Sequence, residues 1–265
     1  MTISMCVVTY NSGGTVLELL RSVYRHRGSY ELKIFICDNA SSDGTPDVIR
    51  QEFPDVTVIE NGTNYGFGHG QNACLPYLGS DYHFIVNPDI IVNSDIFGEM
   101  AGYMQEHPDI VMAVPTYIST DGEKQFTPKL APKIRYMVGG RLERFGGIFE
   151  KWRSIYTMRD DPPSDTVDIG FCSGCFMAVR TDIFLRMGGF DERYFLYNED
   201  ADITRMAQQY GRTVYTPQFS VTHLWERAYM KEHKYFFIQI ESLLKYLWKW
   251  RSGGKYAKSY HRGAS

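Results

Sequence analysis

The alternation of short apolar runs with amphipathic segments is the feature that most constrains the fold of this chain. Apolar runs at residues 3–10, 32–37, 56–59 and 82–86 each suit one strand, and helical spacing or helix-start signals occur between them. A further helix is expected at 93–106 and a fifth strand at 110–115. Because strands joined through helices at this spacing run parallel, we predict a doubly wound α/β sheet, mainly parallel and flanked by helices.

Polar residues stand at the carboxyl ends of three of these strands. The run 82–86 leads into Asn87-Pro88-Asp89, where proline offers no backbone N–H and disfavours helix at the residue before it, so the strand must end there. The first strand ends near Tyr10 and the second on Asp38. In open α/β sheets ligands bind at this edge, so we expect a site there. The alternative is that Asp89 only caps the next helix.

The glycines argue against one common nucleotide-binding fold. A dinucleotide-binding domain would carry G-x-G-x-x-G in its first strand-to-helix turn, and residues 10–15 lack this pattern. The glycine-rich loop lies instead at 61–70, after the third strand. A nicotinamide-dependent oxidoreductase is therefore disfavoured, although Asp38 at the end of the second strand keeps it open.

A second group of acids begins a later helix. Asn198 is a good N-cap, the run Glu199–Asp202 holds three acids in four residues, and Gly211 stands past the end. The helix dipole stabilises an acid in the first turn by roughly 0.3–1 kcal/mol, which accounts for one or two of them. We therefore expect a functional carboxylate here.

Residues 116–166 show no clear periodicity, and we assign them to substrate binding.

Composition excludes some classes of protein. The chain is 43% hydrophobic and 22% charged, as in ordinary globular proteins, and its net charge of −3 argues against a general nucleic-acid binder. Five cysteines and no apolar leader predict a reducing, cytoplasmic setting. Cys172 and Cys175 have redox or zinc spacing, but no second pair follows, so we favour a structural role or a place in a substrate wall.

The last 35 residues are amphipathic and basic. Apolar residues from Phe236 to Trp250 share one helical face, while Lys245, Lys249 and Arg251 interrupt any membrane-spanning segment. Residues 226–265 hold nine Lys/Arg against three Asp/Glu. Packing on the core is the commoner fate of such a helix, and a membrane-surface contact or a homodimer contact stays open.

Five motifs occur in one order: Val8–Asn11, Asp38–Thr45, Asn64–Gly68, Asn87–Asp89 and Gly188–Phe195. Over residues 3–225 this resembles the family 2 glycosyltransferases of GT-A fold, especially the bacterial rhamnosyltransferases. The resemblance implies a GT-A catalytic domain at 1–225, with a nucleotide-sugar half at 1–115 and an acceptor half at 116–225. A C-terminal helical extension, basic and aromatic, would follow at 226–265.

The resemblance also implies roles for single residues. Contacts to the donor are expected from Thr9, Tyr10, Asn11, Asp38, Asn64, Gly66, Phe67, Asn72, Asn87 and Asp89. Asp38 would accept from the base imide N–H. Asp89 and His223 would hold Mg²⁺ or Mn²⁺ on the diphosphate, although Asn87 stands where the family usually has an aspartate. Asp200 would be the catalytic base, and contacts to the acceptor are expected from Cys172, Ser173, Gly174, Glu199 and Trp225.

The chemistry of sugar transfer needs residues of these types. A diphosphate leaving group develops negative charge that a divalent cation with oxygen ligands stabilises, and a poorly nucleophilic hydroxyl needs a general base. The resemblance thus implies an inverting transferase, most simply of L-rhamnose from a dTDP-linked donor to a glycan or polyprenyl-linked acceptor in cell-surface polysaccharide synthesis. It would work in the cytoplasm or on the inner face of the membrane. The alternatives are a UDP-hexose or UDP-N-acetylhexosamine transferase, the oxidoreductase, and a non-catalytic nucleotide-sugar-binding module.

Overall fold

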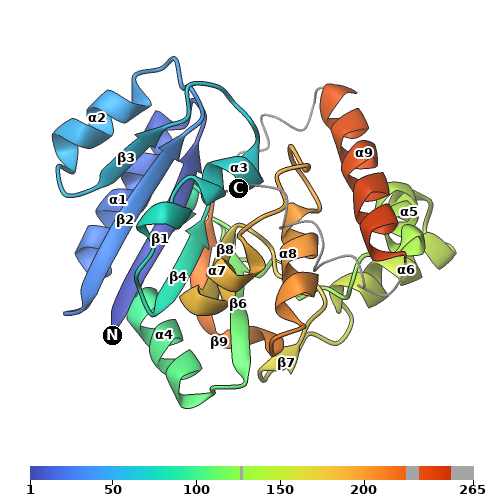
Figure 1. Cartoon of the computed structure of the whole chain (residues 1–265). Coiled ribbons are helices and arrows are strands. Elements are labelled where there is room, and N and C mark those ends of the chain that lie inside the picture. Colours follow the sequence, from blue (N-terminus) through green and yellow to red (C-terminus); the bar gives the residue numbers. More distant parts are fainter. Residues whose placement is uncertain (126–127, 225–232, 252–265) are drawn as a thin grey trace.

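A central sheet with helices on both sides organises the molecule (Figure 1). The computed structural model describes residues 1–125, 128–224 and 233–251. The strands are β1 (Thr2–Thr9), β2 (Glu31–Asp38), β3 (Thr57–Glu60), β4 (Tyr82–Val86), β5 (Ile90–Ile91), β6 (Ile110–Ile118), β7 (Val167–Asp168), β8 (Phe176–Arg180) and β9 (Arg212–His223). The α-helices are α1 (Gly13–His26), α2 (Thr45–Glu52), α3 (Phe67–Asn72), α4 (Ile96–Glu106), α5 (Ile134–Leu142), α6 (Gly147–Thr157), α7 (Thr181–Met187), α8 (Glu199–Ala207) and α9 (His233–Trp250).

The sheet is parallel in its first half and mixed beyond it. Its order is β3-β2-β1-β4-β8-β6-β9-β5, with β7 also paired to β9. Neighbours from β3 to β4 run parallel, as the strand–helix alternation predicts. Strand β8 is antiparallel to both β4 and β6, and β5 and β7 are antiparallel to β9. The predicted α/β fold is confirmed, and beyond the part built from strand–helix–strand units β6 and β9 also pair in parallel.

Both faces of the sheet are buried, which explains the continuous apolar runs in the sequence. Phe84 and Val86 of β4 lie in one core cluster, and Ile85 between them lies in a second. The first cluster also contains the inner faces of α1 and α4, and the second contains those of α7 and α8. The tip of β4 is therefore held from both sides, which fixes the segment that follows it.

Two parts of the chain differ from the sequence prediction. Residues 116–166, which show no clear periodicity in the sequence, contain the helices α5 and α6 and the end of β6. The runs at 214–215 and 219–221 suit two short strands in the sequence but lie in the single strand β9. Its pairing with β6 shifts register after Pro115, next to Thr216 and Pro217. Proline cannot donate to the ladder, and the apparent break in the sequence is therefore an irregularity within one strand.

The C-terminal helix α9 packs on the core through one face. Tyr246 and Trp250 are buried in the second cluster, and the Ser242 hydroxyl donates to the Leu196 carbonyl oxygen at 2.8 Å. The expected helical extension is thus present at 233–250 and contacts the core, while 225–232 and 252–265 lie outside the described residues. None of the helices in the described ranges is both long and apolar enough to cross a bilayer.

Candidate active site

The carboxyl ends of β2, β1 and β4 lie side by side. Thr9 and Asp38 are register partners in the parallel pair β1–β2, and Val7 partners Val86 in β1–β4. The residues that follow these strands, Tyr10, Asn39 and Asn87, therefore begin the loops at one edge of the sheet. This is the edge at which open α/β sheets bind ligands.

Asp38 is buried at this edge and fixed by three hydrogen bonds. Its Oδ1 accepts from the Thr9 hydroxyl at 2.7 Å and from the Ser41 hydroxyl at 2.5 Å, and its Oδ2 accepts from the Ser41 N–H at 2.8 Å. The loop of β1 is tied to the same turn, because the Asn11 N–H donates to the Ser41 hydroxyl oxygen. Thr9, Asn11 and Asp38 thus form one connected group. Tyr10 beside them is exposed.

A close backbone contact holds the glycine-rich loop. The Phe67 N–H donates to the Phe195 carbonyl oxygen at 3.0 Å, and a Cβ on Gly66 would lie 2.1 Å from that oxygen. Gly66 also has φ +98°, a conformation that side chains disfavour. Asn64 Oδ1 accepts from the Gly66 N–H, and the Asn39 side chain donates to the Gly66 carbonyl oxygen. Only glycine suits this position.

Asn72 has a structural role in this loop. Its side-chain amide donates to the Phe190 carbonyl oxygen and to Glu192, each at 2.9 Å, and its Oδ1 accepts from the Phe190 N–H at 2.8 Å. Both amide hydrogens are therefore used inside the protein. Asn72 therefore joins α3 to the 189–192 turn, and its expected contact with the donor stays a prediction.

Asp89 and His223 form a pair beyond β4. The Asp89 Oδ2 lies 3.2 Å from His223 Nε2, and both side chains are largely buried. Burial opposes a charged imidazole, but the hydrogen bonds to Asp89 and Cys175 outweigh it and raise the pKa of His223 to about 10. The other ring nitrogen lies 3.1 Å from Gln125 Oε1. Asp89 Oδ1 is buried and has no hydrogen-bond partner among the described residues.

Asp200 stands in the first turn of α8 with both oxygens engaged. Its Oδ1 accepts from the Ala201 N–H at 2.9 Å, and its Oδ2 lies 3.4 Å from the Gly174 nitrogen. Burial raises the pKa of Asp200, while the Lys129 ammonium and the two N–H groups act in the opposite direction. Burial, followed by the charge of Asp200, raises the pKa of Glu199 well above its usual range. Burial thus favours the protonated form of Glu199 beside Asp200.

One short segment connects the two acidic centres. The Gly174 N–H faces Asp200, and the carbonyl oxygen of the next residue, Cys175, accepts from the Asn87 N–H at 2.8 Å. Ser173 and Cys172 precede them and are buried. The cysteines of this segment are free thiols, and no cluster of three or more metal-ligating side chains occurs among the described residues. The structural or wall role expected of these cysteines stays a prediction.

Two residues near Asp200 carried no recognisable signal in the sequence. The Lys129 ammonium lies 4.7 Å from the centre of the Phe171 ring, and burial lowers its pKa while Asp200 raises it. Burial and the charge of Asp200 raise the pKa of Tyr156, on α6. Both come from the segment without periodicity, which sequence reasoning assigned to substrate binding as a whole. Trp225, also expected at the acceptor, lies outside the described residues.

Comparisons with known proteins agree with the fold and the motif order. A family model described as glycosyl transferase family 2 matches residues 4–188. Over 230 residues the chain is 27% identical to the N-acetylglucosaminyl-diphospho-decaprenol L-rhamnosyltransferase of Mycobacterium tuberculosis, covering 82% of this chain and 74% of that protein. It is also 27% identical to the rhamnosyltransferase WbbL of Escherichia coli, covering 82% and 81%.

A solved structure extends the comparison of folds. GalNAc-T7, crystallised with UDP, GalNAc and Mn²⁺, superposes with a TM-score of 0.68 at 14% sequence identity. The match covers 96% of this chain and 49% of that one, so this chain spans about half the length of that protein. At this identity the similarity concerns the fold.

Proposed function

The chain belongs to glycosyl transferase family 2 and is a glycosyltransferase, and we propose that it transfers L-rhamnose from a dTDP-linked donor to a lipid-linked glycan with inversion. One observation carries the proposal: the segment Ser173–Cys175 holds Asp200 on one side and the approach to Asp89 and His223 on the other. A base for the acceptor and ligands for the leaving group are therefore adjacent. Membership of this family also removes the support for an oxidoreductase.

The donor would lie along the edge formed by β2, β1 and β4. We propose that Thr9, Tyr10, Asn11 and Asp38 line the base, and that Asn64, Gly66 and Phe67 lie near the ribose and sugar. Asp38 Oδ2 accepts a hydrogen bond from the Ser41 N–H and keeps acceptor capacity for an imide N–H. Residues 1–115 would then be the donor half, and 116–225 the acceptor half.

Asp89 and His223 fit a divalent cation. The buried, unpartnered Oδ1 of Asp89 is an oxygen ligand in need of a partner, and the imidazole stands 3.2 Å from Oδ2. The raised pKa of His223 keeps its imidazole protonated without a metal, so coordination by its nitrogen would release a proton. Mg²⁺ and Mn²⁺ sites of this kind use one or two protein ligands together with substrate phosphates and water. When bound, the ion would neutralise the charge of the diphosphate leaving group. The Mn²⁺ in the related fold of GalNAc-T7 supports the assignment.

Asp200 would remove the proton of the acceptor hydroxyl. In a single displacement the acceptor oxygen forms a bond to the anomeric carbon, the bond from that carbon to the diphosphate breaks, and its electron pair leaves with the phosphate oxygen. The proton goes to Asp200, whose orientation is fixed by the N–H groups of Ala201 and Gly174. Its raised pKa makes it a stronger base than an ordinary aspartate. Burial favours the protonated form of the neighbouring Glu199, which is a poorer nucleophile than a carboxylate, and this supports inversion over retention.

The first test is nucleotide binding, followed by turnover of one variant. Thermal-shift titrations with dTDP and UDP, each with and without Mn²⁺ or Mg²⁺, rank the nucleotides because a ligand of the folded state raises Tm by mass action. We expect the largest shift with dTDP plus metal. A larger shift with UDP would move the donor to a UDP-sugar within the same family.

The variant Asp200→Asn should abolish sugar transfer while the nucleotide-induced shift stays close to that of the wild type. The matched control is Asp182→Asn, which removes an exposed acid from the first turn of α7, away from the site. It should leave transfer unchanged. Full turnover by Asp200→Asn would refute the assignment of the base.

A further inference from the structure

The outer face of α9 exposes a row of large apolar side chains. Phe237, Ile240, Leu244 and Trp248 are spaced by three, four and four residues, so they share one side of the helix. They are exposed by 68%, 43%, 61% and 49%. The opposite face carries Tyr246 and Trp250 into the core. Core packing therefore accounts for one face of this helix and leaves a second apolar face at the surface.

The helices α5 and α6 continue this surface. Figure 1 shows α5, α6 and α9 together on the side of the molecule away from α1 and α2. The Arg141 guanidinium lies 4.0 Å from the centre of the Phe236 ring, which joins α5 to α9. Exposed apolar side chains on the two helices and their connection are Ile134, Phe145, Ile148 and Ile155. We call the exposed residues of α5, α6, their connection and α9 the α5–α6–α9 surface.

This surface is strongly basic in a chain whose net charge is −3. Five cations are exposed in residues 133–151, namely Lys133, Arg135, Arg141, Arg144 and Lys151. Lys249 of α9 is buried against Asp191 and Asp202 and does not belong to the surface. The acids are engaged locally: Glu143 lies 2.5 Å from Arg159, and Glu241 lies 2.8 Å from Lys245. Arg144 and Lys151 are exposed. The exposed cations of residues 133–151 therefore give the surface its positive charge.

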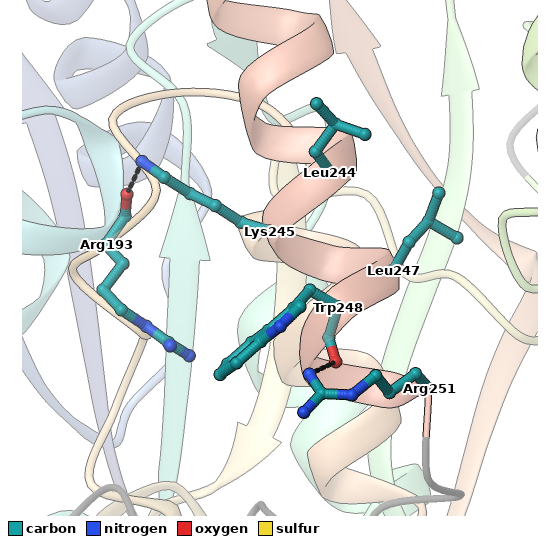
Figure 2. A pocket seen from close by; sticks show the side chains of 6 residues that line it. All are labelled: Arg193, Leu244, Lys245, Leu247, Trp248 and Arg251. Atoms are coloured by element: carbon teal, nitrogen blue, oxygen red, sulfur yellow. Dashed lines mark hydrogen bonds between the residues drawn. The ribbon is translucent and has the colours of Figure 1, made fainter.

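A shallow pocket on α9 is lined by both apolar and cationic side chains (Figure 2). Leu244, Leu247 and Trp248 give it an apolar lining, and Arg193, Lys245 and Arg251 contribute the cationic side chains. The Lys245 ammonium is held there by the Arg193 carbonyl oxygen. Apolar groups flanked by Lys and Arg are the pattern of helices that lie in the headgroup region of a bilayer.

We propose that the α5–α6–α9 surface binds the face of a lipid bilayer that contains anionic lipids. A bilayer fits better than a second protein chain because the exposed apolar side chains and the cations are spread over three helices. An anionic membrane offers both partners over a wide area, since acyl chains accept the apolar groups and anionic headgroups attract the cations. The surface adjoins the candidate site: α9 contacts the Arg193 and Leu196 carbonyls just before α8, and α6 carries Tyr156 toward Asp200. A lipid-linked acceptor would thus be presented beside the base. This last point rests on the proposed function, whereas binding to the bilayer does not.

The experiment is co-sedimentation of the full chain with vesicles. Vesicles of phosphatidylcholine with about a third phosphatidylglycerol are compared with phosphatidylcholine alone, and free inorganic phosphate is added as a competitor. We expect binding to the anionic vesicles, weaker binding to the neutral ones, and no displacement by phosphate. Two variants test the surface: Leu244→Glu in the apolar row, and Arg144→Glu with Lys151→Glu among the cations. Each should lower the partition coefficient at least about tenfold, since one basic residue near an anionic leaflet contributes about fivefold.

The matched control is Leu185→Glu, the same change at an exposed leucine of α7, which lies outside this surface. It should bind as the wild type does, and circular dichroism and Tm should show that all variants are folded. Equal losses in Leu185→Glu and Leu244→Glu, or no binding to anionic vesicles, would overturn the proposal. A dimer that Leu244→Glu converts to a monomer in light scattering, without vesicle binding, would also overturn it and assign the face to a second copy. The vesicle result is independent of any transferase assay, so failure of the proposed function would leave it standing.

Discussion

Lys249 is the side chain through which α9 should contribute most to stability. Its ammonium is 2.5 Å from Asp202 and 2.9 Å from Asp191, and Trp250 Nε1 donates to the other oxygen of Asp202 at 2.7 Å. The side chains of Lys249 and Asp202 are 2% and 1% exposed. Asp191 also pairs with Arg193, but no second cation is recorded on Asp202 within the described residues. Removal of Lys249 therefore leaves a buried carboxylate without its counter-ion.

The expected cost of Lys249→Met follows from that uncompensated charge. Removing one partner of a buried ion pair destabilises by about 3–5 kcal/mol. For a chain of this size, 1 kcal/mol corresponds to roughly 2–4 °C in Tm, so we expect a fall of about 6–20 °C. The matched control is Lys245→Met, one turn earlier on α9. Lys245 is 36% exposed and contacts Glu241 and a backbone carbonyl, and its loss should cost no more than about 1 kcal/mol.

The dependence of this cost on pH separates electrostatics from simple loss of packing. Burial already raises the pKa of Asp202, and Lys249 opposes that effect. Without Lys249 the folded-state pKa of Asp202 rises further above its unfolded value, so folding of the variant takes up a proton and its stability falls as pH rises through that range. The deficit measured by urea unfolding should be smaller at pH 5 than at pH 8, and Lys249→Met/Asp202→Asn should recover part of it. A deficit independent of pH, or one no larger than that of Lys245→Met, would refute the reasoning.

Three further outcomes follow from the site. Gly66→Ala should cost about 1–3 kcal/mol through its positive φ and also displace the Phe195 carbonyl, so urea unfolding should show lower stability and titration weaker dTDP binding. Asn72→Ala should lower stability by about 1–3 kcal/mol with an unchanged nucleotide Kd, whereas a donor contact would weaken binding. Since Asp200 must be ionised and its pKa is raised, kcat should fall on the acid side at a pH above the ordinary aspartate range, a limb that Asp182→Asn leaves in place.

The strands that form the β2–β1–β4 edge could be predicted because local chemistry determines where they end. Proline at residue 88 ends β4, and β2 ends on Asp38 as expected, whereas the register that pairs Thr9 with Asp38 is seen only in the structure. The same reasoning could not place Asn72, since an amide at a loop end suits a ligand and a backbone turn equally well. Its partners lie more than a hundred residues away, in the 189–192 turn, and only the folded chain brings them together.

Helices α5 and α6, within residues 116–166, were missed for a related reason. The amphipathic pattern of α5 is weak and part of its apolar surface faces outward, so the periodicity that burial would impose is absent there, whereas α6 does have an amphipathic pattern. In α9 the opposite holds: the periodicity is clear, but it is the sum of two apolar faces, one in the core and one exposed. Lys249 shows why the sequence does not reveal which face is buried. A lysine among apolar residues is expected at the surface, but Lys249 lies buried between Asp191 and Asp202. Its partner Asp202 is two residues from Asp200. Helix α9, which the sequence analysis places outside the catalytic domain, thus stabilises α8, the helix whose first turn carries the proposed base Asp200.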